Sequence, residues 1–291
     1  MSTANVLRSD GRTADELRAL TIVYESLDRV DGSARFGFGP TQSLTSVSGP
    51  IEIRPNLESP SQATLDIQIR PLASVPGTDS KALATTLKSI LTPALLLSHH
   101  PRTLVQIVGQ ALCGTGSGSG TGSVGRGWNA SLIASLVNAS VAALMNATSV
   151  PMKGIVCAVA VGLVRSASGG VLVLDPSESE LAHLTGGGCF AFLFSATLPS
   201  TPTDSTDIPP CSLLWTNYTS TSPFDERELS DARTLAEKGA REVWKALKES
   251  VGRMEAPLKA SDDRKASTVE DIHAASRDTD IHEEDDVKME V

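Results

Sequence analysis

A glycine-rich stretch is the part of the sequence whose composition points most directly to chemistry. It reads GTGSGSGTGSVGRGWNASL from Gly114 to Leu132. Glycine-rich turns that lead into a helix N-terminus can bind phosphate through backbone N–H groups and the helix dipole. A Walker A loop also needs Lys followed by Ser or Thr after its last glycine, and no glycine in this run precedes Lys. The low complexity of the run favours a flexible loop, and a phosphate cradle remains the alternative.

Cysteine and histidine show no spacing that is typical of a metal site. The four cysteines are widely separated with no CxxC pair, and the five histidines include one adjacent pair, His99 and His100. Because structural zinc sites use closely spaced ligands, we expect no metal. No charged segment followed by an apolar one opens the chain, and no apolar run reaches the ~18 residues of a membrane span. We therefore expect an intracellular protein with reduced thiols and no membrane partner.

The first half of the chain predicts β structure followed by a helix. Residues 21–53 form short alternating runs separated by turns that contain Gly or Pro, which is typical of a strand meander. Residues 64–70, TLDIQIR, alternate apolar and polar side chains as a half-buried strand does. Apolar residues at helical spacing then predict a helix from about residue 80 to His99, and another strand follows Pro101.

The second half predicts a buried helix, further strands and a last helix. Asn129 is a suitable N-cap for a helix whose apolar stripe extends to Met145. Residues 154–164, GIVCAVAVGLV, are apolar throughout, as expected of a strand that is covered on both faces. Further strands are expected at 171–175 and 189–196, and the last helix starts at Ser222–Pro223.

Length and composition indicate one globular domain with an appendage. The chain has 291 residues, 40% of them hydrophobic, and a net charge of −9, which argues against a strongly basic nucleic-acid coat. We expect an α+β domain of two similar halves over residues 1–254, with the Gly/Ser-rich loop 114–127 inside it. Residues 255–291 are acidic and lack apolar periodicity, so we expect a disordered tail.

Three stretches in order resemble the RNase PH family. They are SDGRTADELRAL near the start, then DRVDGSARFGFGPTQSLTSVSGPIE, and finally MKGIVCAVAVGLV with the later LVLDPSESE. The resemblance covers roughly Arg8 to Val251. It implies an α+β fold of two similar halves, with helices packed on mixed β-sheets, that assembles into six-membered rings around a central RNA channel. Within the family, the chain looks most like a ring subunit of the eukaryotic RNA exosome.

The same resemblance implies that the phosphate-binding half of the catalytic machinery is damaged. Active members carry D-G-G-x-R-x-A-S where this chain has the glycine run and Ala130–Ser131. Aligned on that pair, the arginine that holds phosphate falls on Trp128, and Arg126 is displaced by two residues. An indole has one N–H donor and no charge, so it cannot clamp phosphate as a guanidinium does.

The acidic half of that machinery is altered as well. Aligned without gaps on the acidic cluster of VLVLDPSESE, the first catalytic Asp of active members falls on Val173, and the last acid becomes Ser179. Glu178 is kept, Asp175 lies two residues late, and Pro176 fixes the chain behind it. We therefore expect no catalytic residues and no cofactor. The alternative is an active phosphate-dependent 3′-to-5′ exoribonuclease that uses Arg126, Asp175 and Glu178.

The function implied by the resemblance is structural. The chain would be a non-catalytic subunit of a hetero-hexameric ring that guides RNA to a 3′-to-5′ exoribonuclease in RNA processing and degradation. Its implied partners are other RNase PH-like subunits, cap subunits, an associated exoribonuclease and single-stranded RNA. Family positions with basic residues toward the pore correspond to Lys81, Lys88 and Arg102, which would contact RNA or else be ordinary surface charges. The implied location is the nucleus and nucleolus, and also the cytoplasm.

A charged segment near the start also matches family positions. It contains Arg8, Asp10, Arg12, Glu16 and Arg18. Alternating charges at the start of a chain make surface ion pairs that contribute about 0–1 kcal/mol each. The resemblance instead implies a role in ring contacts. The residues alone leave both interpretations open.

Overall fold

The computed structural model describes Arg8 and residues 10–73, 75–113, 129–166, 169–198, 208–221, 223 and 225–279. The glycine-rich loop with Arg126 and Trp128 therefore lies outside the described residues. The chain divides into two units, Met1–Leu247 and Lys248–Val291. The first unit contains both β-sheets and the site described below.

The first sheet has five strands in the order β1-β2-β3-β5-β4. Strand β4 is parallel to β5, and the other neighbours are antiparallel. The parallel pair is connected by helix α1, which packs on β4. The elements are β1 (Leu20–Tyr24), β2 (Gly32–Phe38), β3 (Thr41–Glu52), η1 (Pro55–Leu57), β4 (Thr64–Arg70), α1 (Thr78–Leu91), η2 (Thr92–Ala94), η3 (Leu97–His99) and β5 (Thr103–Ala111).

The second sheet also has five strands, and all of its neighbours are antiparallel. Its order is β10-β8-β6-β7, and β9 pairs with β8 on the same side as β10. The elements are β6 (Ile155–Ser166), β7 (Gly169–Leu174), α3 (Glu178–Leu181), β8 (Leu184–Phe194), β9 (Cys211–Thr216), β10 (Thr219–Ser220) and α4 (Glu226–Thr279).

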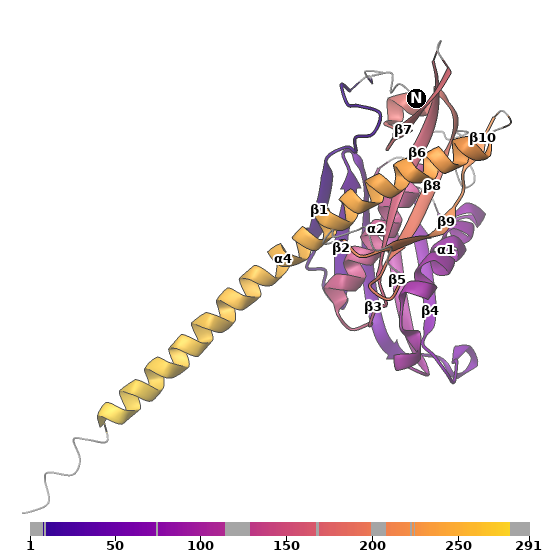
Figure 1. The fold of residues 1–291 in the computed structure, drawn as a ribbon. Coiled ribbons are helices and arrows are strands. Elements are labelled where there is room, and N and C mark those ends of the chain that lie inside the picture. The colour runs from indigo at the N-terminus through magenta and orange to yellow at the C-terminus, as the bar shows by residue number, and fades with distance from the viewer. Residues whose placement is uncertain are drawn as a thin grey trace, which may run out of the picture. The chain divides into compact units, whose positions relative to one another are not determined.

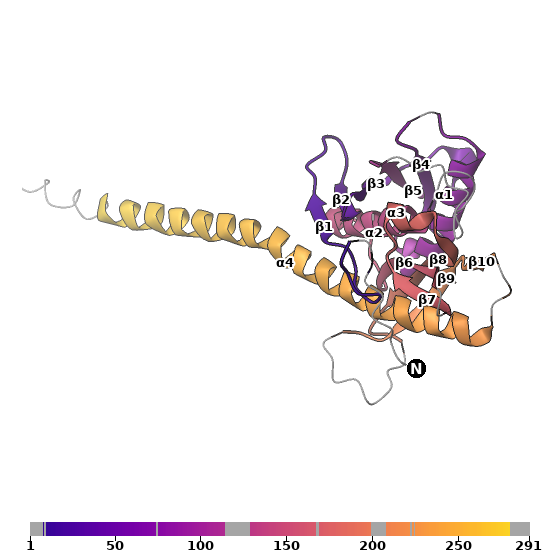
Figure 2. The same ribbon diagram turned by 90° about the horizontal axis from the view of Figure 1, so that it is seen from above.

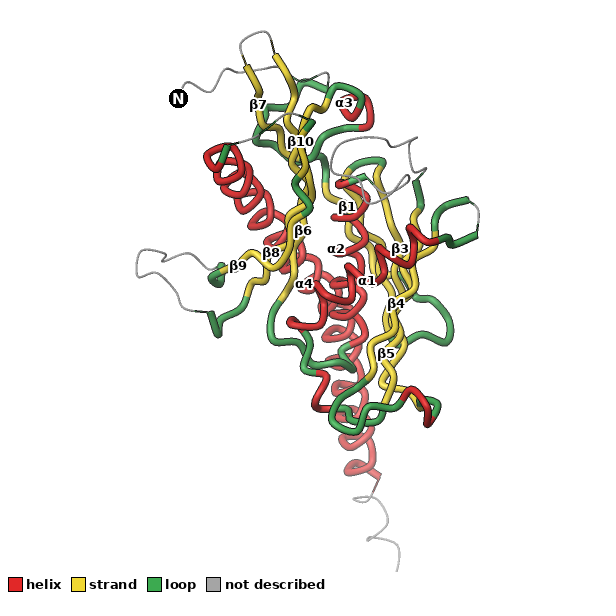
Figure 3. Tube along the Cα trace, turned by 90° about the vertical axis from the view of Figure 1, so that its right-hand side faces the viewer, coloured by secondary structure: helices red, strands yellow, loops and turns green. Residues whose placement is uncertain are grey.

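The two sheets pack on opposite sides of helix α2 (Ala130–Ala147), which contacts strands of both. Figures 1 to 3 show the resulting layers: the first sheet, then α1 and α2, then the second sheet, then the first part of α4. Helix α2 has the length and apolar composition of a membrane span, but 89% of it is buried inside the domain. It is therefore the central core helix, and its apolar surface is used by the two sheets.

The predicted fold class is confirmed: helices pack on one mixed and one antiparallel sheet, in two halves that each pair a sheet with a following helix. The alternating strand at 64–70 is confirmed with the predicted bounds. Asn129 is the N-cap of α2, and its side chain accepts a hydrogen bond of 2.7 Å from the Leu132 N–H.

Some element boundaries differ from the sequence prediction. Helix α1 ends at Leu91, because Pro93 falls in the next turn and short 3₁₀ turns replace the helix up to His99. At the other end of the chain, α4 extends to Thr279, and residues from Lys248 onward form a unit separate from the domain, in agreement with the expected tail. The expected domain boundary at residue 254 stays a prediction.

A buried asparagine of α2 completes the sheet edge beside it. Strand β7 pairs with β6 only from Val161 onward, which leaves the first part of β6 without a strand on that side. Asn138 is fully buried and faces this edge: its Nδ2 donates to the Ala158 carbonyl at 2.9 Å, and its Oδ1 accepts from the Ala158 N–H at 2.8 Å. The side-chain amide therefore replaces a neighbouring strand.

We predict that Asn138→Leu lowers the free energy of unfolding by about 2–5 kcal/mol, because two buried backbone groups lose their partners at about 1–3 kcal/mol each. Ser140→Ala is the matched control, since Ser140 is equally buried on α2 but bonds only to the Leu136 carbonyl of its own helix. Urea unfolding of both variants measures the difference. Equal losses in the two variants would contradict the assigned role of Asn138.

Candidate functional site at the amino-terminal strap

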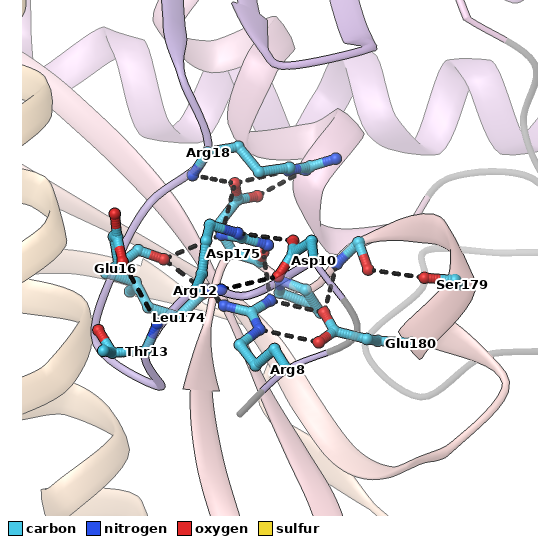
Figure 4. A network of polar contacts seen from close by, with 12 residues as sticks. Arg8, Asp10, Arg12, Thr13, Glu16, Arg18, Leu174, Asp175, Ser179 and Glu180 are labelled. Atoms are coloured by element: carbon cyan, nitrogen blue, oxygen red, sulfur yellow. Dashed lines mark hydrogen bonds and ion pairs between the residues drawn. The ribbon is translucent and has the colours of Figure 1, made fainter. Parts of the chain in front are cut away.

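The amino-terminal segment crosses the edge of the second sheet. We call Arg8 and residues 10–18 the strap. It contains no helix or strand, and the Ala14 carbonyl accepts a hydrogen bond of 2.7 Å from the Leu174 N–H at the end of β7. Figure 4 shows the charged side chains of the strap converging on the turn between β7 and α3. The strap therefore brings arginines next to the acidic segment that the sequence singled out.

Asp175 is fully buried at the centre of this site. Arg18 binds both of its carboxylate oxygens, with Nη2 to Oδ1 at 2.6 Å and Nε to Oδ2 at 2.7 Å. The backbone N–H of Arg18 donates to Oδ2 at 3.2 Å, and the Ser131 hydroxyl donates to Oδ1 at 3.3 Å. Bidentate pairing of this kind is the strongest arrangement available to a carboxylate. Both oxygens of Asp175 are therefore engaged within the fold.

Arg8 makes a second bidentate pair with Glu180 of α3. Its Nε lies 2.8 Å from Oε1, and its Nη2 lies 2.5 Å from Oε2. The same guanidinium also donates to the carbonyl oxygens of Leu174 and Asp175, at 2.7 and 3.0 Å. Glu180 in turn closes the capping box of α3, because Oε2 accepts from the Ser177 N–H at 2.7 Å. Formation of this short helix is thus coupled to docking of the strap.

The pKa of Glu180 and the backbone conformation of Asp175 both agree with a structural role for these two acids. Burial by itself raises the pKa of Glu180, but hydrogen bonds from Arg8 and Ser177 and the charge of Arg8 outweigh it and leave that pKa below its ordinary 4.5. Asp175 adopts a positive φ of 47°, which non-glycine residues rarely do. The hydrogen bond of 2.8 Å from its N–H to the Ala160 carbonyl holds this turn in place.

The structure of the strap contradicts part of one interpretation of its charged residues. Surface ion pairs were one expectation for its charged residues, and this is wrong for Arg8 and Arg18, which are both buried. Arg12 pairs with Asp10 at 2.7 Å, but its side chain is only 11% exposed and also donates to the Asp175 carbonyl at 3.2 Å. The strap also has an exposed ion pair between Asp15 and Lys238 of α4 at 2.5 Å.

The other predicted catalytic positions are not gathered at this site. Val173, where the family's first Asp falls, is buried on β7, and Glu178 is exposed at the start of α3. Arg126 and Trp128 lie outside the described residues. Within the described ranges, no group of three or more His, Cys, Asp or Glu side chains is placed to hold a metal ion.

The three predicted RNA contacts lie on the first half of the domain. Lys81 and Lys88 are exposed on α1, seven residues apart and thus on one face of the helix. Arg102 is exposed just before β5 and forms an ion pair of 3.1 Å with Glu58. By topology it lies at the end of the sheet where α1 finishes, because α1 runs back along β4 and β4 is parallel to β5.

Comparisons with known proteins agree with this fold. Residues 16–149 match the model of domain 1 of the RNase PH 3′ exoribonuclease family. The Exosome complex exonuclease RRP46 homolog of Oryza sativa subsp. japonica is 30% identical over 177 residues, covering 61% of this chain and 67% of that protein. The chain belongs to the RNase PH family. The Exosome complex component RRP46 of Saccharomyces cerevisiae is 30% identical over 155 residues, covering 53% of this chain and 65% of the yeast protein.

Solved structures of RNase PH-family proteins share the fold. The crystal structure of rice Rrp46 superposes with a TM-score of 0.66 at 22% identity, covering 84% of this chain and all of that one. A subunit of the Archaeoglobus fulgidus exosome, solved with RNA bound to the active site, gives a TM-score of 0.59 at 20% identity. It covers 83% of this chain and 92% of the archaeal one.

We predict that Arg8→Met lowers the free energy of unfolding by about 3–5 kcal/mol, because it leaves the buried Glu180 carboxylate without its ion partner. Because the pKa of Glu180 is lowered in the folded state, its contribution is present above pH 4.5 and is lost as the pH falls through the folded-state pKa. The variant should lack this part of the pH dependence. Urea unfolding at pH 7 and below pH 4.5 measures both effects.

The control for that prediction is Arg227→Met, which removes an exposed arginine of α4. It should leave stability nearly unchanged at each pH. If Arg8→Met and Arg227→Met gave the same small loss, the strap would not be anchored by Glu180.

Proposed function

We propose that this protein is a non-catalytic structural subunit of the RNA exosome core ring, where it helps form the channel that guides RNA to a 3′-to-5′ exoribonuclease. The observation that carries the proposal is the engagement of Asp175, whose two carboxylate oxygens are both bound by Arg18. A catalytic acid must reach the reacting group or a metal ion. Asp175 is instead buried and paired within its own chain.

The sequence changes in the family's catalytic segments support the same conclusion. Val173 replaces the first catalytic Asp in our alignment, and its buried aliphatic side chain can neither bind metal nor transfer a proton. Trp128 replaces the arginine that holds phosphate. Phosphorolysis depends on positioning and charge stabilisation of the attacking phosphate, so loss of both groups removes the main sources of rate enhancement.

The alternative is a phosphate-dependent 3′-to-5′ exoribonuclease. It is favoured by the name of the rice relative, which is called an exosome complex exonuclease. In this chain such an enzyme would use Arg126, Asp175 and Glu178. Of these, Glu178 is exposed and accessible, whereas Asp175 would first have to be released from Arg18. The structural role therefore fits the geometry better.

The proposed partners follow from the relatives. The rice and yeast relatives are named as parts of the exosome complex, and the archaeal exosome was solved with RNA at its active site. We place this chain in a hetero-hexameric ring with other RNase PH-like subunits, beneath cap subunits and next to an associated exoribonuclease. The corresponding compartments are the nucleus, the nucleolus and the cytoplasm.

Within this role, Lys81, Lys88 and Arg102 are the proposed contacts to RNA. Lys81 and Lys88 present their ammonium groups on one exposed face of α1, where they can follow a phosphate backbone. Arg102 is 70% exposed but shares its charge with Glu58. We therefore expect the two lysines to contribute more than the arginine.

We predict no phosphate-dependent release of nucleoside diphosphates when the purified chain is incubated with 5′-labelled single-stranded RNA, with or without Mg²⁺. An active family member run in parallel shows that the assay works, and circular dichroism shows that the chain is folded. Release that requires phosphate would establish the alternative. In that event Asp175→Asn and Glu178→Gln would identify the acids involved.

We predict that combined replacement of Lys81, Lys88 and Arg102 by Ala weakens RNA protection by the assembled ring without affecting assembly. Loss of cationic contacts should also reduce the dependence of RNA affinity on salt concentration. The matched control replaces three exposed basic residues of α4, Arg227, Arg233 and Lys245, by Ala. Equal RNA crosslinking in the two variants would exclude this assignment.

A further inference from the structure

The loop between β3 and β4 contains a serine that is followed by proline. The ends of this loop, Ile53 and Ala63, are buried, and every residue from 54 to 62 is exposed or half-buried. Ser59 and Pro60 follow the short turn η1. A residue before proline favours an extended backbone, and Glu58, directly before Ser59, has one, with φ −68° and ψ 133°. The loop therefore presents Ser59 in an accessible segment without a helix or strand.

We propose that Ser59 is a phosphorylation site for a proline-directed protein kinase and that Arg102 binds the phosphate. Such kinases bind their substrate as an extended segment and select proline directly after the acceptor, a residue that has no backbone N–H. In the reaction, the Ser59 hydroxyl oxygen forms a bond to the γ-phosphorus of ATP while the bond to the β,γ-bridging oxygen breaks. ADP leaves with that electron pair, and the hydroxyl proton passes to the catalytic base of the kinase.

Arg102 is held beside Ser59 by its own backbone. Its N–H donates to the Ser59 carbonyl at 3.1 Å. It also adopts a positive φ of 61°, which non-glycine residues rarely do, directly before β5. Its side chain reaches the residue next to Ser59, with Nε 3.1 Å from Oε1 of Glu58. These contacts to two adjacent residues place a guanidinium within reach of a phosphate on Ser59.

A phosphate on Ser59 is a stronger partner for Arg102 than Glu58 is. It carries about −1.5 to −2 charges at pH 7 and three acceptor oxygens, and the guanidinium fork binds such oxygens in pairs. The side chains of Arg102 and Glu58 are 70% and 29% exposed, so their ion pair is weak and can be exchanged. Phosphorylation would also withdraw Arg102 from RNA. That consequence rests on the proposed function, whereas the site itself does not.

Thr92 provides a comparison within the same domain. Thr92–Pro93 is the other place in the described ranges where a hydroxyl residue precedes proline. The Thr92 hydroxyl donates to the Lys88 carbonyl at 2.6 Å, and its backbone is helical, with φ −52° and ψ −47°. A kinase could extend this segment only by unwinding the end of α1. The structure therefore favours Ser59 over Thr92, although both have the same sequence signal.

The first experiment maps phosphate on the purified full chain after treatment with a mitogen-activated protein kinase and ATP. Mass spectrometry quantifies each site in the wild type, Ser59→Ala and Thr92→Ala. We expect at least about tenfold more phosphate on Ser59 than on Thr92, because Thr92 is accessible only after local unfolding. Thr92→Ala should be modified on Ser59 as the wild type is. Absence of phosphate on Ser59, or equal modification of Ser59 and Thr92, would overturn the proposal.

The second experiment tests the role of Arg102 by phosphorus NMR of the phosphorylated chain, with the Ser59 signal assigned by its loss in Ser59→Ala. The second pKa of phosphoserine is about 6, and a nearby guanidinium lowers this pKa because it favours the dianion. We expect the pKa of the Ser59 phosphate to be lower in the wild type than in Arg102→Gln by at least about 0.3. The matched control is Arg70→Gln, which removes an exposed arginine at the other end of β4 and should leave this pKa unchanged.

Equal phosphate pKa values in the wild type and Arg102→Gln would show that Arg102 does not bind the phosphate. Neither experiment uses RNA or another subunit. Failure of the proposed ring function would therefore leave both results unchanged, and failure of the phosphorylation site would leave the ring function standing.

Discussion

The pairing of Arg18 with Asp175 is the interaction on which the rest of this structure depends. It joins the strap to the turn after β7 across 157 positions of sequence, with both carboxylate oxygens bound. Once the two charges are buried, removing either partner leaves the other without compensation, which is far more costly than losing a surface ion pair. The second pair, between Arg8 and Glu180, repeats this arrangement on α3 and completes its capping box.

On the proposed non-catalytic role, this constraint also explains how the acidic segment can serve the fold. The acidic segment lies where the strap, β7 and the start of α2 meet, and Ser131 of α2 contacts Asp175 there. In this chain the acid nearest the family's catalytic position stabilises the fold, because arginine and backbone donors engage it completely.

Sequence patterns predicted the elements that depend on local periodicity. The alternation in residues 64–70 and the N-cap at Asn129 are both found as predicted, because strand faces and helix starts are set by neighbouring residues. The buried strap could not be predicted in this way. Its contacts span more than 150 positions, and a run of alternating charges is typical of a solvated surface. The role of Asn138 could not be predicted from local patterns either, because its partner Ala158 lies on another element.

A double-mutant cycle between Arg18 and Asp175 tests the central claim most directly. The free energies of unfolding are measured for the wild type, Arg18→Met, Asp175→Asn and the double variant. Because each residue is the buried partner of the other, the account predicts a coupling free energy of at least about 2 kcal/mol and a clear loss of stability for Asp175→Asn alone. A coupling near zero, with Asp175→Asn as stable as the wild type, would show that Asp175 is not held by the fold and would return it to the list of candidate catalytic acids.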